Sequence, residues 1–193
     1  RILAKESPVD ADIVIGVPDS SLSAAYGYAE ASGIPYEMGL IKNRYVGRTF
    51  IEPSPALREK GVKKKLSPLI SIIQGKRVVL IDDSIVRGTT SMKIVEMLRQ
   101  SGAKEIHMRI ASPAIIAPCF YGVDTSTYEE LISAFNDKEA VRQLIKADSL
   151  SFLSMEGLTQ ALGKREFCHA CFTKDYPTHL YEHIENANKD GKF

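Results

Sequence analysis

The sequence has little of several features that mark particular classes of protein. It contains no Trp and only three Cys in 193 residues, and 25 Lys and Arg almost balance 24 Asp and Glu, giving a formal net charge of +1. Three cysteines are too few for the disulfide framework of a small secreted domain. The charge balance provides no overall field that would attract nucleic acid or an anionic membrane. We therefore expect neither of these partners, and any anion-binding site must be local.

Long hydrophobic runs and a signal peptide are also missing. Apolar runs such as Val78–Ile81 are far shorter than the roughly 20 residues that span a bilayer. The first residues, Arg1–Glu6, lack the apolar core of a secretory signal. These absences indicate a cytoplasmic protein. Because the chain does not begin with Met and soon enters a strand-like run, we expect a fragment or processed form whose upstream partner has been removed.

What is present is typical of a folded α/β domain. Hydrophobic residues make up 44% of the chain and charged residues 25%, which is close to average usage. The hydrophobic pattern predicts strands over 12–17, 36–41, 78–81, 105–111 and 150–153, and helices over 21–32, 91–100, 126–134, 136–147 and from 154 onward. This alternation predicts a doubly wound fold, a mostly parallel sheet flanked by helices. We divide the chain into a core over 1–150 and a Cys-containing, helical C-terminal extension over 151–193 that packs on it.

Two predicted strand ends carry the polar residues of greatest chemical interest. In open α/β sheets ligands bind at the carboxyl ends of the strands, which singles out Val17–Ser21 and Asp82–Thr90. Asp82 and Asp83 are adjacent carboxylates that could accept hydrogen bonds from a sugar diol or help to hold Mg²⁺. The residues that follow could cradle a phosphate at a helix N-terminus; they are Ser84, Arg87, Gly88, Thr89 and Thr90. Together these features predict a site for a ribose 5-phosphate.

Two segments resemble a known family. Val78–Thr90 resembles the phosphoribosylpyrophosphate (PRPP) motif of the type I phosphoribosyltransferases, and Lys42–Phe50 resembles the flexible loop of the amidophosphoribosyltransferases. The resemblance extends from Val14 to Tyr181 and implies the type I phosphoribosyltransferase fold. It further implies that this chain is the carboxyl-terminal domain of such an enzyme, with a glutaminase domain expected upstream of residue 1.

The resemblance implies an activity and its partners. The reaction would be displacement of pyrophosphate from PRPP by ammonia, which forms 5-phosphoribosylamine in the first committed step of purine biosynthesis. Purine nucleotides would inhibit at the same site, since they present the same ribose 5-phosphate. The complete enzyme would be a homo-oligomer that draws its ammonia from glutamine, whereas this chain would at most use free ammonia.

Residue roles follow from the same resemblance. Asp82 and Asp83 would bind the ribose hydroxyls, and Arg87–Thr90 would bind the 5-phosphate, with Ser84 also in the substrate-binding set. The turn containing Pro18, Asp19 and Ser20 would bind pyrophosphate, and Ser20 would join the two aspartates around Mg²⁺. Departure of pyrophosphate leaves positive charge on the ribose, so the site must neutralise the leaving group and exclude water. A lid beginning at residue 42 would do this with Lys42, Arg44, Tyr45 and Arg48.

The cysteines form an incomplete metal-binding set by themselves. Cys168 and Cys171 have the spacing of a metal or redox site, with Cys119 far away in the sequence. One branch of the amidophosphoribosyltransferases carries a four-iron four-sulfur cluster, and these three cysteines match three of its four ligands. The fourth would lie before Arg1. Free buried thiols and a zinc site with His169 are the alternatives.

Several alternatives stay open at this stage. The main alternative function is a non-catalytic regulator that binds PRPP, although a sensor has no need of a lid. A receiver domain would place its acidic pair after the first strand, and a nucleobase-salvage enzyme would need a base pocket that we do not identify. We interpret the basic run Lys60–Lys65 as solvated surface rather than an allosteric nucleotide site, His107 as a packing residue, and His179 and His183 as part of a solvated helix.

Overall fold

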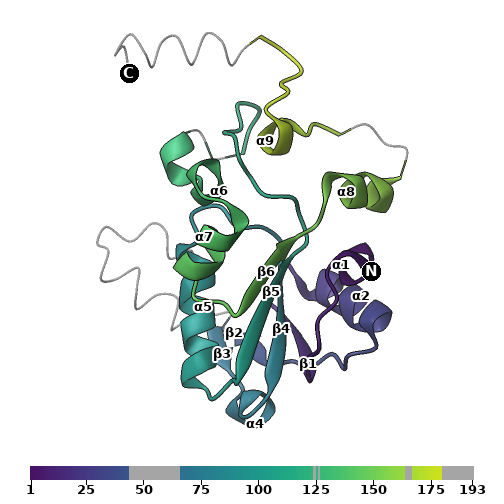
Figure 1. Cartoon of the computed structure of the whole chain (residues 1–193), viewed down its shortest axis with the longest axis vertical. Coiled ribbons are helices and arrows are strands. Elements are labelled where there is room, and N and C mark those ends of the chain that lie inside the picture. The colour runs from purple at the N-terminus through teal and green to yellow at the C-terminus, as the bar shows by residue number, and fades with distance from the viewer. Residues whose placement is uncertain (44–65, 124, 126, 164–166, 180–193) are drawn as a thin grey trace.

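A computed structural model describes residues 1–43, 66–123, 125, 127–163 and 167–179 (Figure 1). Its centre is a four-stranded sheet in the order β1-β4-β5-β6 in which every neighbouring pair is parallel. The strands are β1 (Ile13–Gly16), β4 (Arg77–Asp82), β5 (Glu105–Ile110) and β6 (Ser149–Phe152). The runs of β-branched and other apolar residues in β1 and β4 are typical of parallel strands that are covered on both faces. The predicted α/β class is confirmed.

Helices cover the two faces of this sheet, as Figure 1 shows. On one face lie α1 (Ile2–Glu6) and α2 (Leu22–Ser32), which pack with Val14, Val79 and Ile81. On the other face lies α5 (Thr89–Gln100), which packs with Val78 and Leu80. Alternate residues of each strand therefore enter different cores, because successive side chains of a strand point to opposite faces.

The remaining elements surround this centre. They are β2 (Leu40–Lys42), β3 (Leu66–Pro68), α4 (Ile70–Ile73), the 3₁₀ turn η2 (Tyr128–Glu130), α6 (Ile132–Phe135), α7 (Lys138–Leu144), α8 (Met155–Leu162) and α9 (Ala170–Thr173). Side chains cap two of the predicted helices: Asp137 accepts from the Ala140 N–H, and Ser154 accepts from the Gly157 N–H, both at 2.8 Å. Within the described ranges, no helix is long and apolar enough to cross a membrane.

Two predicted elements differ in the structure. The strand over 36–41 is only partly present: Tyr36 makes a single bridge to Val14, and the chain then leaves the parallel sheet, so that only residues 40 and 41 fall in a strand, β2, which pairs antiparallel with β3. The Ile15 side chain lies close against the backbone of Gly39 at this point, since a Cβ on Gly39 would lie 2.2 Å from Ile15 Cδ1. The helix over 126–134 is broken at Leu131, which is extended and buried. Leu131 is buried in an extended conformation, so the chain turns at this residue and forms η2 and α6 in place of one continuous helix.

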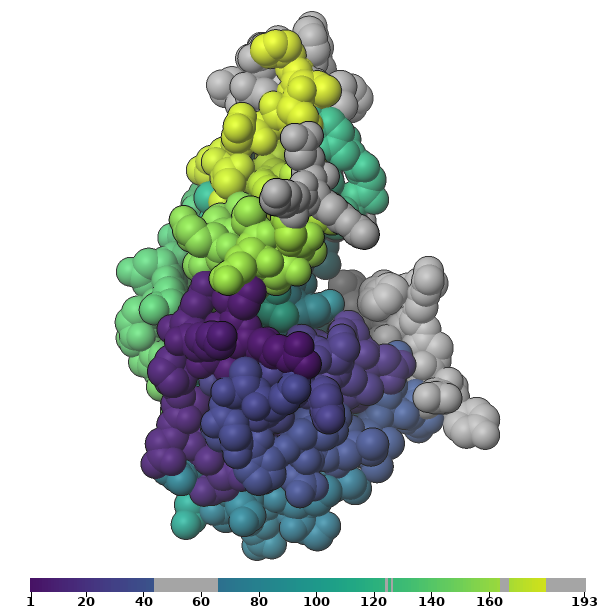
Figure 2. Space-filling view, turned by 90° about the vertical axis from the view of Figure 1, so that its right-hand side faces the viewer, coloured from purple at the N-terminus to yellow at the C-terminus, as the bar shows by residue number. Residues whose placement is uncertain are grey.

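The N-terminal segment is tied to the C-terminal half of the chain. The Ser7 carbonyl accepts hydrogen bonds from Tyr28 Oη at 2.9 Å and from Arg109 Nε at 3.0 Å. Glu6 accepts from both the N–H and the hydroxyl of Ser154, and the space-filling view shows the N-terminal residues directly below the α8 region (Figure 2). The predicted boundary at residue 150 falls inside β6, and the polar tail after residue 179 lies outside the described ranges.

Candidate functional site

The sheet brings the two predicted strand ends together. β1 pairs with β4 so that Gly16 lies beside Ile81, and the Val17 N–H continues the ladder by donating to the Ile81 carbonyl at 2.9 Å. The residues after Gly16 and those after Ile81 therefore leave the same edge of the sheet. They enclose a cavity of about 310 Å³, lined by Val17, Ser20, Asp82, Asp83, Ser84 and residues 85–91.

The first wall of this cavity is the turn between β1 and α2. The turn closes with a hydrogen bond from the Ser21 N–H to the Val17 carbonyl at 3.1 Å. The peptide between Pro18 and Asp19 is cis. α2 starts close against β1, since a Cβ on Gly16 would lie 2.8 Å from Ala25 Cβ. Ser20 is exposed in the cavity, whereas Ser21 is buried and donates to Asp82 Oδ1 at 3.0 Å. That bond links the two strand ends directly.

The second wall begins with the acidic pair, whose members have different environments. Asp82 is only 6% exposed and accepts hydrogen bonds from the Ser21 hydroxyl and the Asp83 N–H. Burial, together with the neighbouring charge of Asp83, raises the pKa of Asp82 to about 7, although both hydrogen bonds oppose the shift. Asp83 is exposed and accepts from the Ser84 N–H at 2.9 Å. A cation or hydroxyl donors beside this pair would favour its charged form.

The same wall ends at the N-terminus of α5. Gly88 is the N-cap residue and has a φ of +74°, a conformation that favours glycine. Thr89 and Thr90 follow in the first turn of a 12-residue helix, where backbone N–H groups lack partners inside the helix and favour an anion. Arg87 lines the cavity, but its guanidinium pairs with Glu130 of η2. Glu130 was not predicted as a site residue, because it lies far away in the chain and belongs to no recognisable motif.

One predicted lid residue lies within the described ranges. Lys42 ends β2, and its Nζ pairs with Asp19 Oδ2 at 2.7 Å, which brings the start of the predicted lid beside the β1–α2 turn. The other predicted lid residues, Arg44, Tyr45 and Arg48, lie outside the described residues, as does the run Lys60–Lys65. The roles of all four lid residues stay predictions.

The three cysteines come from two segments that pack together. The N–H groups of Ile116 and Ala117 donate to the Cys171 carbonyl at 2.9 and 3.1 Å, which holds the loop preceding Cys119 against α9. Burial raises the pKa of the Cys171 thiol, and the nearby thiols of Cys119 and Cys168 add to this shift. All three are free of disulfides. Among the residues that can be placed, no group of three His, Cys, Asp or Glu side chains forms a metal site.

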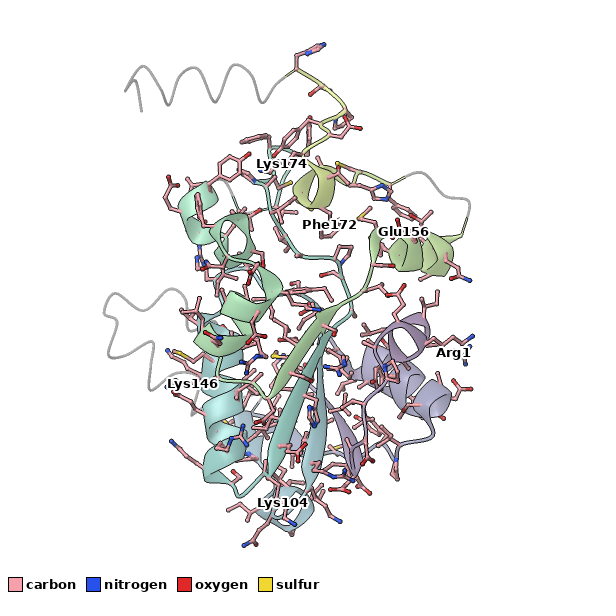
Figure 3. The ribbon with its side chains drawn as sticks, viewed as in Figure 1. Arg1, Lys104, Lys146, Glu156, Phe172 and Lys174 are labelled. Carbon is pink, nitrogen blue, oxygen red and sulfur yellow. The ribbon has the colours of Figure 1, made fainter. Side chains whose placement is uncertain are left out.

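A second cavity was not foreseen from the sequence. It measures about 530 Å³ and lies behind the Arg87–Thr89 loop, between that loop and the segment η2–α7. Lys146, just after α7, pairs with Glu96 of α5, and Lys174 Nζ lies 5.8 Å from the ring centroid of Tyr128 in η2; both lysines are labelled in Figure 3. These contacts join residues far apart in sequence, so no local pattern could have predicted the cavity.

Comparison with known proteins defines the class to which this fold and site belong. The family model of the phosphoribosyl transferase domain matches residues 3–112, which include both walls of the first cavity. The chain belongs to this family. Its curated relatives are, more particularly, amidophosphoribosyltransferases: the protein of Bacillus subtilis is 62% identical over 97% of this chain, and that of Methanocaldococcus jannaschii is 57% identical over 93%.

A solved structure agrees with these relatives. The glutamine PRPP amidotransferase from Bacillus subtilis, complexed with ADP and GMP, matches 94% of this chain with a TM-score of 0.84 and 62% sequence identity. The expected type I phosphoribosyltransferase fold and the resemblance to amidophosphoribosyltransferases are therefore confirmed. The chain spans 42% of the Bacillus subtilis protein and 38% of the Methanocaldococcus jannaschii protein.

Proposed function

We propose that this chain is the transferase part of an amidophosphoribosyltransferase and forms 5-phosphoribosylamine and pyrophosphate from PRPP and ammonia. The observation that carries the proposal is the joining of two strand-end loops around one cavity through the hydrogen bond from Ser21 to Asp82. One loop offers a turn for a pyrophosphate, and the other offers carboxylates and a helix N-terminus for a ribose 5-phosphate. PRPP contains both groups in one molecule.

The proposed reaction breaks the bond between ribose C1 and the pyrophosphate oxygen and forms a bond from C1 to the ammonia nitrogen. Asp82 and Asp83 would hold the ribose hydroxyls, and the backbone of 88–90 would hold the 5-phosphate. The turn around Ser20, with Lys42, would bind the leaving pyrophosphate. Lys42 already lies at this turn through its ion pair with Asp19. The predicted lid residues Arg44, Tyr45 and Arg48 would then exclude water, which competes with ammonia for C1.

The donor set fits Mg²⁺ held together with the substrate. Mg²⁺ usually takes one or two carboxylates and completes its shell with waters and substrate phosphates. Asp82, Asp83 and the Ser20 hydroxyl offer such a partial set at one edge of the cavity. When bound, the ion would supply charge neutralisation for the departing pyrophosphate.

The three cysteines provide part of a set for an iron–sulfur cluster. A four-iron four-sulfur cluster is usually held by four thiolates, and the chain contains only Cys119, Cys168 and Cys171. We propose these as three ligands and expect the fourth from outside this sequence. Assays of iron and acid-labile sulfide on the complete enzyme, purified without oxygen, test this proposal. Absence of both, or cluster content unchanged by Cys171→Ser, would contradict it.

Purine nucleotides are proposed as competitive inhibitors of this chain. A nucleoside monophosphate presents the same ribose 5-phosphate as PRPP, so AMP or GMP should occupy the loop of 87–90 and the aspartates. The Bacillus subtilis relative was solved with ADP and GMP bound. The apparent Kd for PRPP should rise linearly with GMP concentration from its value without GMP. Simultaneous binding of both at full affinity would contradict a shared site.

Pyrophosphate release from PRPP and Mg²⁺ tests the proposed activity. It is measured with ammonium salt, with glutamine and with neither. We expect turnover with ammonium salt but not with glutamine, because the use of glutamine requires a glutaminase domain. We propose such a domain as the partner of this chain. We also propose that the complete enzyme is a cytoplasmic homo-oligomer. PRPP binding without release under any condition would instead favour the alternative of a non-catalytic regulator.

A further inference from the structure

The loop that carries the proposed 5-phosphate site is supported from behind by one residue of α6. The backbone N–H of Ile132 donates to the Val86 carbonyl at 2.8 Å. A Cβ built on Gly88 would lie only 2.6 Å from Ile132 Cδ1, so the end of this side chain lies directly against the glycine. The backbone and the side chain of Ile132 thus fix two positions of the loop, one on each side of Arg87.

Other contacts behind the loop are weaker or more distant. The nearest atom of Ile145 is 3.6 Å from the same built Cβ position. The side chains of Arg87 and Glu130 are 55% and 33% exposed, and an ion pair that faces solvent contributes little because water screens it. Much of the remaining space behind the loop is the 530 Å³ cavity. Among the residues that the structure describes, Ile132 is therefore the principal support of the loop from this side.

The contacts of Ile132 with residues 86–88 matter because the loop of 87–90 would bind the 5-phosphate through its backbone. A helix N-terminus binds phosphate through backbone N–H groups whose directions are set by the dihedral angles of the residues at the cap. Here the cap residue is Gly88 at a φ of +74°, and glycine is the residue least restrained by its own side chain. Within α5 the Gly88 carbonyl accepts from the Met92 N–H at 2.9 Å. Beyond α5 the conformation must be held by neighbours, and the atom closest to the position of a Cβ on Gly88 is Cδ1 of Ile132.

We propose that Ile132 is a positioning residue for the 5-phosphate of PRPP, which holds residues 86–88 so that the N–H groups at the start of α5 face the phosphate. This inference rests on the proposed function of the loop. It concerns the half of the site that binds ribose 5-phosphate and leaves the β1–α2 turn, where pyrophosphate would bind, unaffected.

Titration calorimetry of the whole chain tests the inference with the two halves of the substrate. Ribose 5-phosphate and pyrophosphate with Mg²⁺ are titrated separately. Ile132→Ala should weaken the binding of ribose 5-phosphate by about tenfold, because small displacements of binding groups are costly, and should leave pyrophosphate binding unchanged. Ile132→Val lacks the Cδ1 atom that lies against Gly88 and should fall between Ile132→Ala and the wild type. If Ile132→Ala fails to fold, Ile132→Val tests the inference in its place.

Phe135→Ala is the matched control, because Phe135 is on the same helix and lines the same cavity but is 71% exposed. It should bind both ligands as the wild type does. Wild-type affinity for ribose 5-phosphate in both Ile132 variants would overturn the inference, and so would equal losses for the two ligands, which would indicate general destabilisation. A wild-type chain that binds neither ligand would instead overturn the proposed function.

Discussion

At the scale of single residues, Asp82 combines a cost in stability with a proposed role in binding. It is buried beside Asp83, and its two hydrogen bonds only partly offset the loss of solvation. None of the ion pairs among the described residues involves Asp82, and burial of a charge without a countercharge is unfavourable for the ligand-free fold. The proposed site therefore holds a carboxylate that the ligand-free protein would be more stable without.

Replacing this carboxylate should separate stability from binding. Asp82→Asn keeps a side-chain oxygen for the Ser21 hydroxyl but removes the buried charge. At pH 8 we expect the Tm of the ligand-free protein to rise by roughly 2–4 °C, as for a gain of about 1 kcal/mol in a chain of this size. PRPP binding with Mg²⁺ should be lost. A lower Tm in thermal denaturation would contradict the view that Asp82 is destabilising.

At the scale of secondary-structure elements, an ion pair joins the starts of β1 and β4. Asp12 accepts hydrogen bonds from the Arg77 backbone N–H at 2.7 Å and from its Nη2 at 2.9 Å. These bonds lower the pKa of Asp12 to about 2. The carboxylate is charged in both folded and unfolded chains at neutral pH, and the stability it contributes is lost as the pH falls from about 4 to about 2.

Asp12→Asn should therefore change how stability depends on pH. The urea midpoint of the variant should lie below that of the wild type at pH 7, and the gap should narrow at pH 3 because the wild type has then lost part of the contribution. Asp10→Asn is the control: Asp10 also pairs with Arg77, but its side chain is 88% exposed. An equal gap at both pH values would contradict the assignment to Asp12.

The N-terminus of α8 links two elements from opposite ends of the chain. The Ser154 hydroxyl accepts from the Gly157 N–H at 2.8 Å and donates to Glu6 Oε1 at 2.6 Å. Loss of an N-cap serine costs about 1 kcal/mol, so Ser154→Ala should lower the Tm by roughly 2–4 °C. Ser71→Ala, at an exposed serine of α4, should leave it unchanged. Equal Tm values for the two variants would show that the cap contributes nothing.

At the scale of the whole molecule, the sequence predicted those features that depend on local pattern. The apolar run before Asp82 predicted a buried parallel strand, and the switch-point rule singled out Asp82–Thr90 and Val17–Ser21 as strand ends of interest. The parallel strand is seen, and residues of both strand ends line one cavity. The approach of Glu130 and Ile132 to residues 86–88 was missed, because it depends on tertiary packing between segments more than 40 residues apart. The break of the helix at Leu131 has the same origin.

Titration of PRPP with Mg²⁺ into the whole chain tests the central claim most directly, which is that two strand ends form one PRPP site. It compares the wild type with Asp83→Asn and with Asp175→Asn, an exposed aspartate outside the cavity. We predict that Asp83→Asn weakens binding at least about tenfold, as expected for loss of a charged hydrogen-bond acceptor, and that Asp175→Asn binds as the wild type does. Failure of the wild type to bind PRPP, or unchanged affinity in Asp83→Asn, would contradict the account.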